Sequence, residues 1–354
     1  MADKQGNPFA RAAGTAVAAG AAAGAAYLAL GNFLYGQLLS RKAATRGLNS
    51  MPKEDLLAGK ASQAPPSPWE RFLAKLVGEA SGLGDFYEQP YFPSFQAGAK
   101  WFYDRNPEKA VLLSPRGERL HADMIRNEKP SDVWFLCLHG YLSSPRDFGG
   151  AAKVYYGWGY NILLPHLGGH GESESKAVSM GWLDRLDIVA WIDYLVRTYE
   201  NPRIVLHGVS MGGATAMMTT GEALPPNVAC CVEDCGYTSV WDEYAVQAKE
   251  TLHMGAFPGL YALDAVVRLR SGFSLKEASC VEQVKKSKTP TLFIHGEADE
   301  FVPFWMLDEV YQAAACEKEK LAVPGAGHAE SAYQKELYYG AIRAFADRYL
   351  REGG

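Results

Sequence analysis

The sequence predicts an α/β protein whose mostly parallel central sheet carries helices on both faces. From about residue 98 onward, short apolar runs typical of strands alternate with segments of helical periodicity. The run at 133–138 is apolar at every position, which is typical of a strand buried on both faces. Strand–helix alternation of this kind indicates a parallel sheet, because parallel strands need a crossover connection.

The predicted elements follow one another in a regular order. An opening strand pair is expected at 111–113 and 120–125, around the turn at Arg116 and Gly117. Further strands are predicted at 133–138, 160–164, 204–206, 228–232, 291–294 and 321–323, with helices over 184–199 and around Leu337 to Phe345. Residues 237–288 are too long for one crossover helix and are rich in aromatic and aliphatic residues. We expect them to form a helical cap over the site.

The N-terminal part of the chain differs in composition from the rest. After a tail at 1–11, residues 12–40 contain no charged residue and are long enough to cross a hydrocarbon core of roughly 30 Å as a helix. Because the run is rich in Ala and Gly, a membrane anchor, a secretory signal peptide and a low-complexity tail all remain open. We expect an anchor, and therefore a membrane-associated protein. The few flanking cations leave the membrane face undecided.

Residues 41–97 are predicted to connect this segment to the main domain at 98–354. They contain a Pro-rich linker at 65–68, followed by a short amphipathic helix in which apolar residues recur at helical spacing between Trp69 and Val77. We expect that helix to pack on the main domain, and a position on a membrane surface is the alternative.

Composition excludes several classes of partner and cofactor. The formal net charge is −5, so the chain has no basic footprint for nucleic acid. No C-x-x-C pair with zinc-ligand spacing occurs among the six cysteines, and their positions do not indicate a disulfide framework. We therefore predict neither a metal nor a cofactor. The oligomeric state stays open.

Ser210 lies at the centre of a G-x-S-x-G pattern formed by residues 208–212. The pattern alone is common, but here a predicted strand at 204–206 precedes it and a helix at 213–218 follows it. A sharp strand-to-helix turn needs small residues around a serine and lifts its hydroxyl above the sheet. The context therefore predicts Ser210 as a nucleophile rather than as part of a simple connecting turn.

A serine hydroxyl needs a base, and the base needs a carboxylate to hold its tautomer. His328 follows the last short strand on a Gly-rich loop, and Asp299 follows the strand at 291–294. The resulting order of nucleophile, acid and base agrees with one known arrangement of such a triad. Asp234, at the end of the strand before the insert, is an alternative acid. We expect it to support the site or to anchor the cap instead.

The oxyanion formed by nucleophilic attack needs preorganised donors. The backbone N–H of Met211, directly after Ser210, is one expected donor. The second is the backbone N–H of Tyr141, in the loop after the strand at 133–138. Since the backbone would donate, the side chain at 141 is expected to tolerate change.

Five segments occur in an order that resembles the α/β-hydrolase superfamily: 139–141, 166–173, 208–212, 295–303 and 325–328. The resemblance covers about residues 100–350. It is strongest to a bacterial group of membrane-anchored or exported hydrolases related to serine aminopeptidase-like and acyl-ester hydrolases. It implies an α/β-hydrolase fold with a cap at 237–288, a triad of Ser210, Asp299 and His328, and an oxyanion hole at Tyr141 and Met211. Leu167 and Gly168 depart from it, because many relatives carry an arginine there.

Three functions follow as hypotheses. The first is a serine hydrolase that cleaves a small-molecule carboxylic ester through an acyl-enzyme. The second is a peptidase or amidase with the same three residues, and the third is a non-catalytic binding protein on this fold. The natural substrate is not specified by the sequence, since this fold hosts many acyl substrates.

Overall fold

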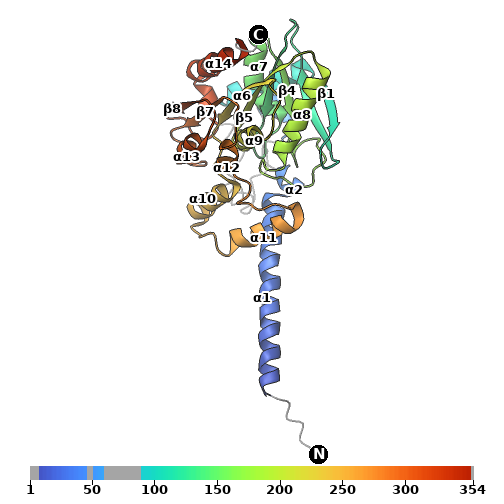
Figure 1. Ribbon diagram of the computed structural model, residues 1–354, viewed down its shortest axis with the longest axis vertical. Helices are drawn as coiled ribbons and strands as arrows, with labels where there is room; N and C mark the ends of the chain where they lie inside the picture. Colours follow the sequence, from blue (N-terminus) through green and yellow to red (C-terminus); the bar gives the residue numbers. More distant parts are fainter. Residues whose placement is uncertain (1–7, 46–50, 60–88, 352–354) are drawn as a thin grey trace, which may run out of the picture.

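The computed structural model describes residues 8–45, 51–59 and 89–351; for 8–21 and 251–252 it describes the backbone alone (Figure 1). The predicted Pro-rich linker at 65–68 and the amphipathic helix at 69–77 lie outside the described residues.

One eight-stranded sheet organises the domain. Its strands are β1 (Glu108–Leu113), β2 (Arg119–Ile125), β3 (Val133–Leu138), β4 (Asn161–Pro165), β5 (Arg203–Val209), β6 (Val228–Asp234), β7 (Thr291–Gly296) and β8 (Lys318–Val323). They lie in the order β1-β2-β4-β3-β5-β6-β7-β8. The β1–β2 and β2–β4 pairs are antiparallel and the other pairs are parallel. The prediction of a mostly parallel sheet is therefore confirmed.

Helices cover both faces, and alternate residues of each central strand reach the two layers. In β3, Trp134 and Leu136 belong to one apolar core, while Phe135 and Cys137 belong to the other. The first core includes residues of α8 (Asp184–Thr198), α9 (Met211–Thr220) and α13 (Trp305–Ala313). The second includes residues of α6 (Phe92–Arg105), α7 (Gly149–Gly157) and α14 (Lys335–Arg351). Burial on both sides explains why these strands are apolar at successive positions.

The insert between β6 and β7 is helical, as predicted. It contains α10 (Val240–Leu252), α11 (Gly259–Ser271) and α12 (Cys280–Val284). Part of its aromatic content is used internally, since the ring of Tyr261 contacts those of Trp241 and Phe257.

The N-terminal segment begins with the long helix α1 (Pro8–Leu38), followed by the short α2 (Arg41–Ala44). Figure 1 shows α1 projecting from the domain, with α11 beside its inner end. There Tyr35, Leu38 and Leu39 are buried in the first core. The last residues of the apolar run at 12–40 therefore pack into the protein itself. Across the described part of the chain, no helix is both long enough and apolar enough to cross a membrane.

Candidate active site

Ser210 lies on the sharp turn between β5 and α9. Its backbone has φ 57° and ψ −120°, a conformation that non-glycine residues rarely adopt. The flanking glycines make the turn possible, because a Cβ on Gly208 would collide with the carbonyl oxygen of Gly212 and a Cβ on Gly212 with that of Leu138. The strand-to-helix context predicted for Ser210 is confirmed.

The structure brings Ser210, His328 and Asp299 into one hydrogen-bonded chain. Nε2 of His328 lies 2.9 Å from Oγ of Ser210, and Nδ1 of His328 lies 2.8 Å from Oδ2 of Asp299. Because a carboxylate only accepts, Nδ1–H donates to Asp299 and leaves Nε2 to accept the hydroxyl proton of Ser210. The ring of Phe301 lies edge-on to the His328 ring, with centroids 4.8 Å apart.

Asp299 is held ionised and in place by its surroundings. Its Oδ1 accepts hydrogen bonds of 2.9 Å from the backbone N–H groups of Phe301 and Val302. Burial by itself raises the pKa of this carboxyl, but the neighbouring imidazoles of His328 and His295 outweigh burial and hold the pKa well below its usual range. Asp299 therefore remains an acceptor for His328 at any pH near neutrality.

A second histidine, His295, also contacts Asp299. Nε2 of His295 lies 2.8 Å from the carbonyl oxygen of Val302 and 3.3 Å from Oδ2 of Asp299, and the side chain is fully buried. Burial lowers the pKa of His295, but the hydrogen bond to Asp299 and the negative charge of Asp299 outweigh burial, so the net shift of this pKa is upward. Since the Val302 carbonyl only accepts, Nε2 carries a proton in both charge states.

Two buried carboxyl groups, those of Glu233 and Glu243, interact electrostatically with His295. The β6–β7 register pairs Glu233 with Phe293, so His295 is its diagonal neighbour on the same face of the sheet. Burial raises the pKa of both glutamates to about 8. Oε1 of Glu233, Oε2 of Glu243 and Nδ1 of His295 have no hydrogen-bond partner among the described residues. Sequence reasoning missed both glutamates, because neither belongs to a motif.

Asp234 supports the segment that follows His328 rather than the insert. Its Oδ1 accepts from the hydroxyl of Ser331 at 3.1 Å and its Oδ2 from that of Tyr338 at 2.9 Å. Both donors follow His328 in the chain, in η3 (Ser331–Tyr333) and α14. In addition, the backbone carbonyl of Asp234 accepts from the N–H of Ser210 at 2.8 Å. The expected supporting role fits this geometry, whereas the two hydroxyls that donate to its carboxylate do not lie in the insert.

Tyr141 and Met211 border the nucleophile. Gly140, before Tyr141, lies so close that an added Cβ would be 3.6 Å from Cβ of Ser210. Met211 is the first residue of α9, so its N–H has no acceptor within the helix.

Two further histidines fix the surrounding loops: Nε2 of His139 accepts from the N–H of Leu167 at 3.1 Å, and Nε2 of His170 accepts from the N–H of Leu142 at 3.3 Å.

A cavity of about 760 Å³ opens onto Ser210 and His328. Much of its wall is aromatic, including Tyr91, Phe95, Trp158, Tyr333 and Tyr339. These residues come from α6, the end of α7, η3, α14 and the segments beside them. No described lining residue belongs to 237–288. The wall of this cavity therefore comes from α6, α7, η3 and α14, and the expected position of the insert as a cap over the site stays a prediction.

One group of residues meets the distance condition for a metal site. Among the described residues, Cys235, Asp299 and His328 offer ligand atoms within 4.8 Å of one another. Asp299 and His328 are already hydrogen-bonded together. Burial raises the pKa of the Cys235 thiol well above its usual range, which disfavours the thiolate that a metal would need. A metal ion here would therefore have to displace the Ser210–His328–Asp299 chain.

The sequence matches a family described as alpha/beta hydrolase fold over residues 133–280. Similar proteins include YqkD of Bacillus subtilis, at 25% identity over 53% of this chain, and YfhR of Escherichia coli O157:H7, at 27% over 54%. These matches span 63% and 56% of the two relatives. The predicted likeness to membrane-anchored bacterial hydrolases stays a prediction.

Solved structures share the fold at low sequence identity. Esterase Pf2001 of Pyrococcus furiosus superposes with a TM-score of 0.55 and 22% identity, over 70% of this chain and 94% of the esterase. A puromycin-hydrolysing peptidase of Mycobacterium tuberculosis superposes with a TM-score of 0.54 and 18% identity, over 69% of this chain and 39% of the peptidase.

Proposed function

Because this chain belongs to the α/β-hydrolase superfamily, we propose that it is a serine hydrolase that cleaves a carboxylic ester through an acyl-enzyme intermediate. The observation that carries the proposal is the hydrogen-bonded chain from Ser210 through His328 to Asp299, placed at the mouth of a cavity. A solved esterase is among the structures that share the fold.

In the proposed reaction, Oγ of Ser210 attacks the carbonyl carbon of the ester while Nε2 of His328 takes its proton. The ionised Asp299 stabilises the imidazolium that forms. His328 then gives the proton to the leaving alcohol, which yields the acyl-enzyme. A water molecule next loses a proton to His328 and attacks the acyl group, which releases the carboxylic acid and restores Ser210.

We assign the backbone N–H groups of Met211 and Tyr141 as the donors that stabilise the negative charge on the carbonyl oxygen. Met211 lies beside Ser210 at the start of α9, and Tyr141 lies beside it in the loop after β3. A backbone N–H at a helix N-terminus favours an anion. Loss of one such donor typically lowers turnover by about 10²–10³-fold.

The cavity wall supports an apolar or aromatic acyl or alcohol group of moderate size. Its volume of about 760 Å³ lies within the usual range for small-molecule sites, roughly 300–1,000 Å³. The aromatic side chains of Tyr91, Phe95 and Tyr333 offer apolar contact close to Ser210 and His328.

Covalent labelling with a fluorophosphonate tests the mechanism. Wild-type protein should label and hydrolyse p-nitrophenyl esters, and Ser210→Ala should do neither. Ser131→Ala, at the opposite end of the sheet near the start of β3, is the matched control and should behave as wild type. Equal labelling of Ser210→Ala and wild type would overturn the assignment of the nucleophile. Absence of turnover with every acyl substrate would favour the non-catalytic binding protein instead.

A peptidase or amidase with the same residues is the second candidate, and the likeness to a puromycin-hydrolysing peptidase favours it. An ester chain-length series should be compared with aminoacyl and peptide amides of matched acyl groups. If kcat/KM is higher for amides after correction for intrinsic reactivity, the peptidase assignment replaces the esterase assignment.

A further inference from the structure

Exposed apolar side chains gather at the end of the domain from which α1 projects. Seven of the eleven large hydrophobic side chains that are exposed among the described residues lie on α1, on α11 or in the loop before α11. We call these seven the apolar collar: Leu28, Leu30, Phe33, Met254, Phe257, Tyr261 and Leu269. Phe257 and Leu269 are 73% and 74% exposed. Single exposed apolar residues are ordinary, but a cluster marks an interaction surface.

Close packing of α1 on α11 joins the two parts of the collar. Gly31 permits this approach, because a Cβ there would collide with the carbonyl oxygen of Ala262. The hydroxyls of Tyr35 and Ser271 lie 3.1 Å apart, which fixes the C-terminal end of α11 on α1. Figure 1 shows the two helices side by side at this end of the domain.

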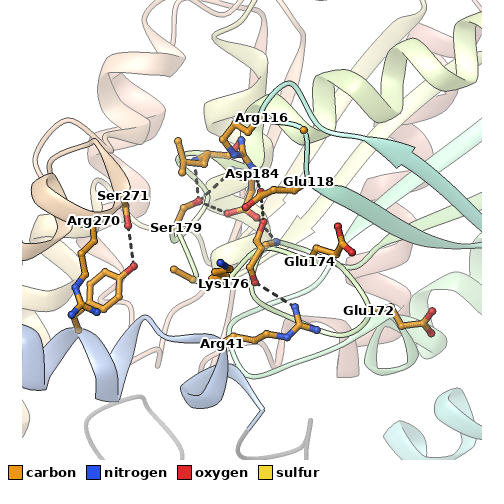
Figure 2. Close-up of a pocket in the computed structure, with 16 residues that line it drawn as sticks. Arg41, Arg116, Glu118, Glu172, Glu174, Lys176, Ser179, Asp184, Arg270 and Ser271 are labelled. Carbon is orange, nitrogen blue, oxygen red and sulfur yellow. Dashed lines mark hydrogen bonds and ion pairs between the residues drawn. The ribbon is translucent and has the colours of Figure 1, made fainter.

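A cavity of about 860 Å³ begins at the contact between α1 and the end of α11, where Tyr35, Arg270 and Ser271 line it, and several charged side chains form the rest of its wall (Figure 2). Arg270 reaches it from the residue after Leu269, Arg41 from α2, and Lys176 from the loop after β4. Arg41 donates to the backbone carbonyls of Gly171, Ser173 and Ser175, and Arg270 lies over the Tyr35 ring. None of the three cations has a carboxylate at ion-pair distance within the part of the chain that the structure describes.

The carboxylates that line the same cavity all have partners. Glu118 pairs with Arg116 at 3.2 Å, Glu172 with Lys109 at 2.6 Å, and Glu174 with Arg119. Asp184 accepts from the N–H of Gly168 at 2.6 Å and from the hydroxyl of Ser179. Three of these four carboxylates are therefore paired with cations, whereas the exposed Lys176 and Arg270 have no carboxylate partner among the described residues.

We propose that the apolar collar and this basic cavity together dock the domain on an anionic lipid bilayer. The collar side chains enter the boundary between headgroups and acyl chains, and Arg41, Lys176 and Arg270 contact lipid phosphates. Exposed apolar residues beside cations are the chemistry that an anionic membrane surface binds. A second copy of this chain fits less well, because it would place the same cations against one another. This surface does not depend on the proposed hydrolase activity.

A dye that reports its environment tests whether the collar touches lipid. The test variant is the full chain with Cys316→Ser, because Cys316 is the only cysteine that is not buried. It also carries Leu269→Cys, which provides a single site for labelling with an NBD dye. The matched control carries Leu113→Cys, because Leu113 is 67% exposed on β1, outside the collar. Both proteins are mixed with vesicles of phosphatidylcholine, with or without phosphatidylserine.

With phosphatidylserine vesicles, we expect the dye at 269 to shift to shorter wavelength and to be quenched by brominated acyl chains. The dye at 113 should do neither. A dye at 269 that stays in water while the protein is vesicle-bound would overturn the proposal, and so would an absence of vesicle binding. A shift at 269 that needs no lipid and grows with protein concentration would also overturn it, in favour of self-association.

The basic cavity is tested by Lys176→Gln combined with Arg270→Gln. We expect binding to phosphatidylserine vesicles to fall at least tenfold, since each cation near an anionic surface contributes roughly fivefold. Binding to pure phosphatidylcholine should change little. Equal loss on both kinds of vesicle, or no loss, would contradict the role of the cations. Hydrolysis of a short soluble ester by the same variants, and vesicle binding by Ser210→Ala, should both match wild type, which separates this proposal from the catalytic one.

Discussion

The phenol of Tyr141 donates a hydrogen bond of 2.5 Å to the carbonyl oxygen of Leu38. Leu38 is the last residue of α1, where helix carbonyls lack partners within the helix. Tyr141 is the residue whose backbone N–H we assign to the oxyanion. This single bond therefore connects the N-terminal helix to the loop beside Ser210.

Tyr141→Phe removes this bond and keeps the backbone N–H. We expect the free energy of unfolding to fall by about 1 kcal/mol, as for one hydrogen bond, and kcat on a soluble ester to fall less than tenfold. Urea unfolding and ester kinetics measure both quantities. Tyr194→Phe, on α8, is the control. A loss of a hundredfold or more would mean that the phenol itself acts in the reaction.

The contact of α1 with α11 predicts opposite effects for two glycines of the same helix. Alanine in place of a helical glycine normally stabilises by roughly 0.5–1 kcal/mol. Gly24 has no atom within 4 Å of an added Cβ, so Gly24→Ala should be neutral or stabilising. Gly31→Ala should destabilise by about 1–3 kcal/mol, because the Cβ collides with the backbone of Ala262. Denaturation of the full chain, followed by tryptophan fluorescence, compares them. Equal behaviour of the two variants would contradict the close packing.

The sheet and the chain from Ser210 to Asp299 were predictable because local patterns encode them. The runs at 133–138 and 228–232, which form β3 and most of β6, are apolar throughout, and the residues at the ends of β5 and β7 stand in ordered motifs. Contacts between distant segments leave no such pattern. The sequence around Gly31 and around Ala262 does not predict that these two residues are in contact. Likewise, the aromatic residues of the insert do not predict that α6 and α7 contribute to the wall of the cavity.

Stability should depend on pH through Glu243. Burial raises the pKa of this carboxyl to about 8, above its usual value near 4.5, so the folded state favours the neutral form. The stability that this preference contributes is fully present below the usual pKa and is lost as the pH rises through about 8.

Glu243→Gln keeps a neutral group of similar shape. The variant should therefore gain stability over wild type as the pH rises from 5 to 9, on the order of a few kcal/mol at the upper end. Unfolding free energies at four or five pH values measure this. Glu309→Gln, exposed on α13, is the control and should run parallel to wild type. A constant difference between Glu243→Gln and wild type across the range would show that Glu243 does not titrate there.

His295 should affect the pH dependence of kcat/KM for ester hydrolysis. Burial is outweighed by the hydrogen bond to Asp299 and by the charge of Asp299, which raise the pKa of His295 and favour its imidazolium form, and Asp299 lies between the imidazoles of His295 and His328. The other titratable groups that interact electrostatically with His295 are Glu233, Glu243 and Asp234, and burial raises the pKa of each. A nearby cation disfavours protonation of a neighbouring base.

His295→Gln removes that cation and keeps a donor for the Val302 carbonyl. The midpoint of the acid limb of kcat/KM should therefore move to higher pH by about one to two units, because two charges roughly 6–10 Å apart interact by about 1.5–3 kcal/mol at an effective dielectric near 20. Glu233→Gln is the matched control from the same cluster. Its carboxyl, with a pKa of about 8, is already neutral on that limb, so the midpoint should not move. A fall in kcat/KM at every pH with an unchanged midpoint would assign His295 a purely structural role.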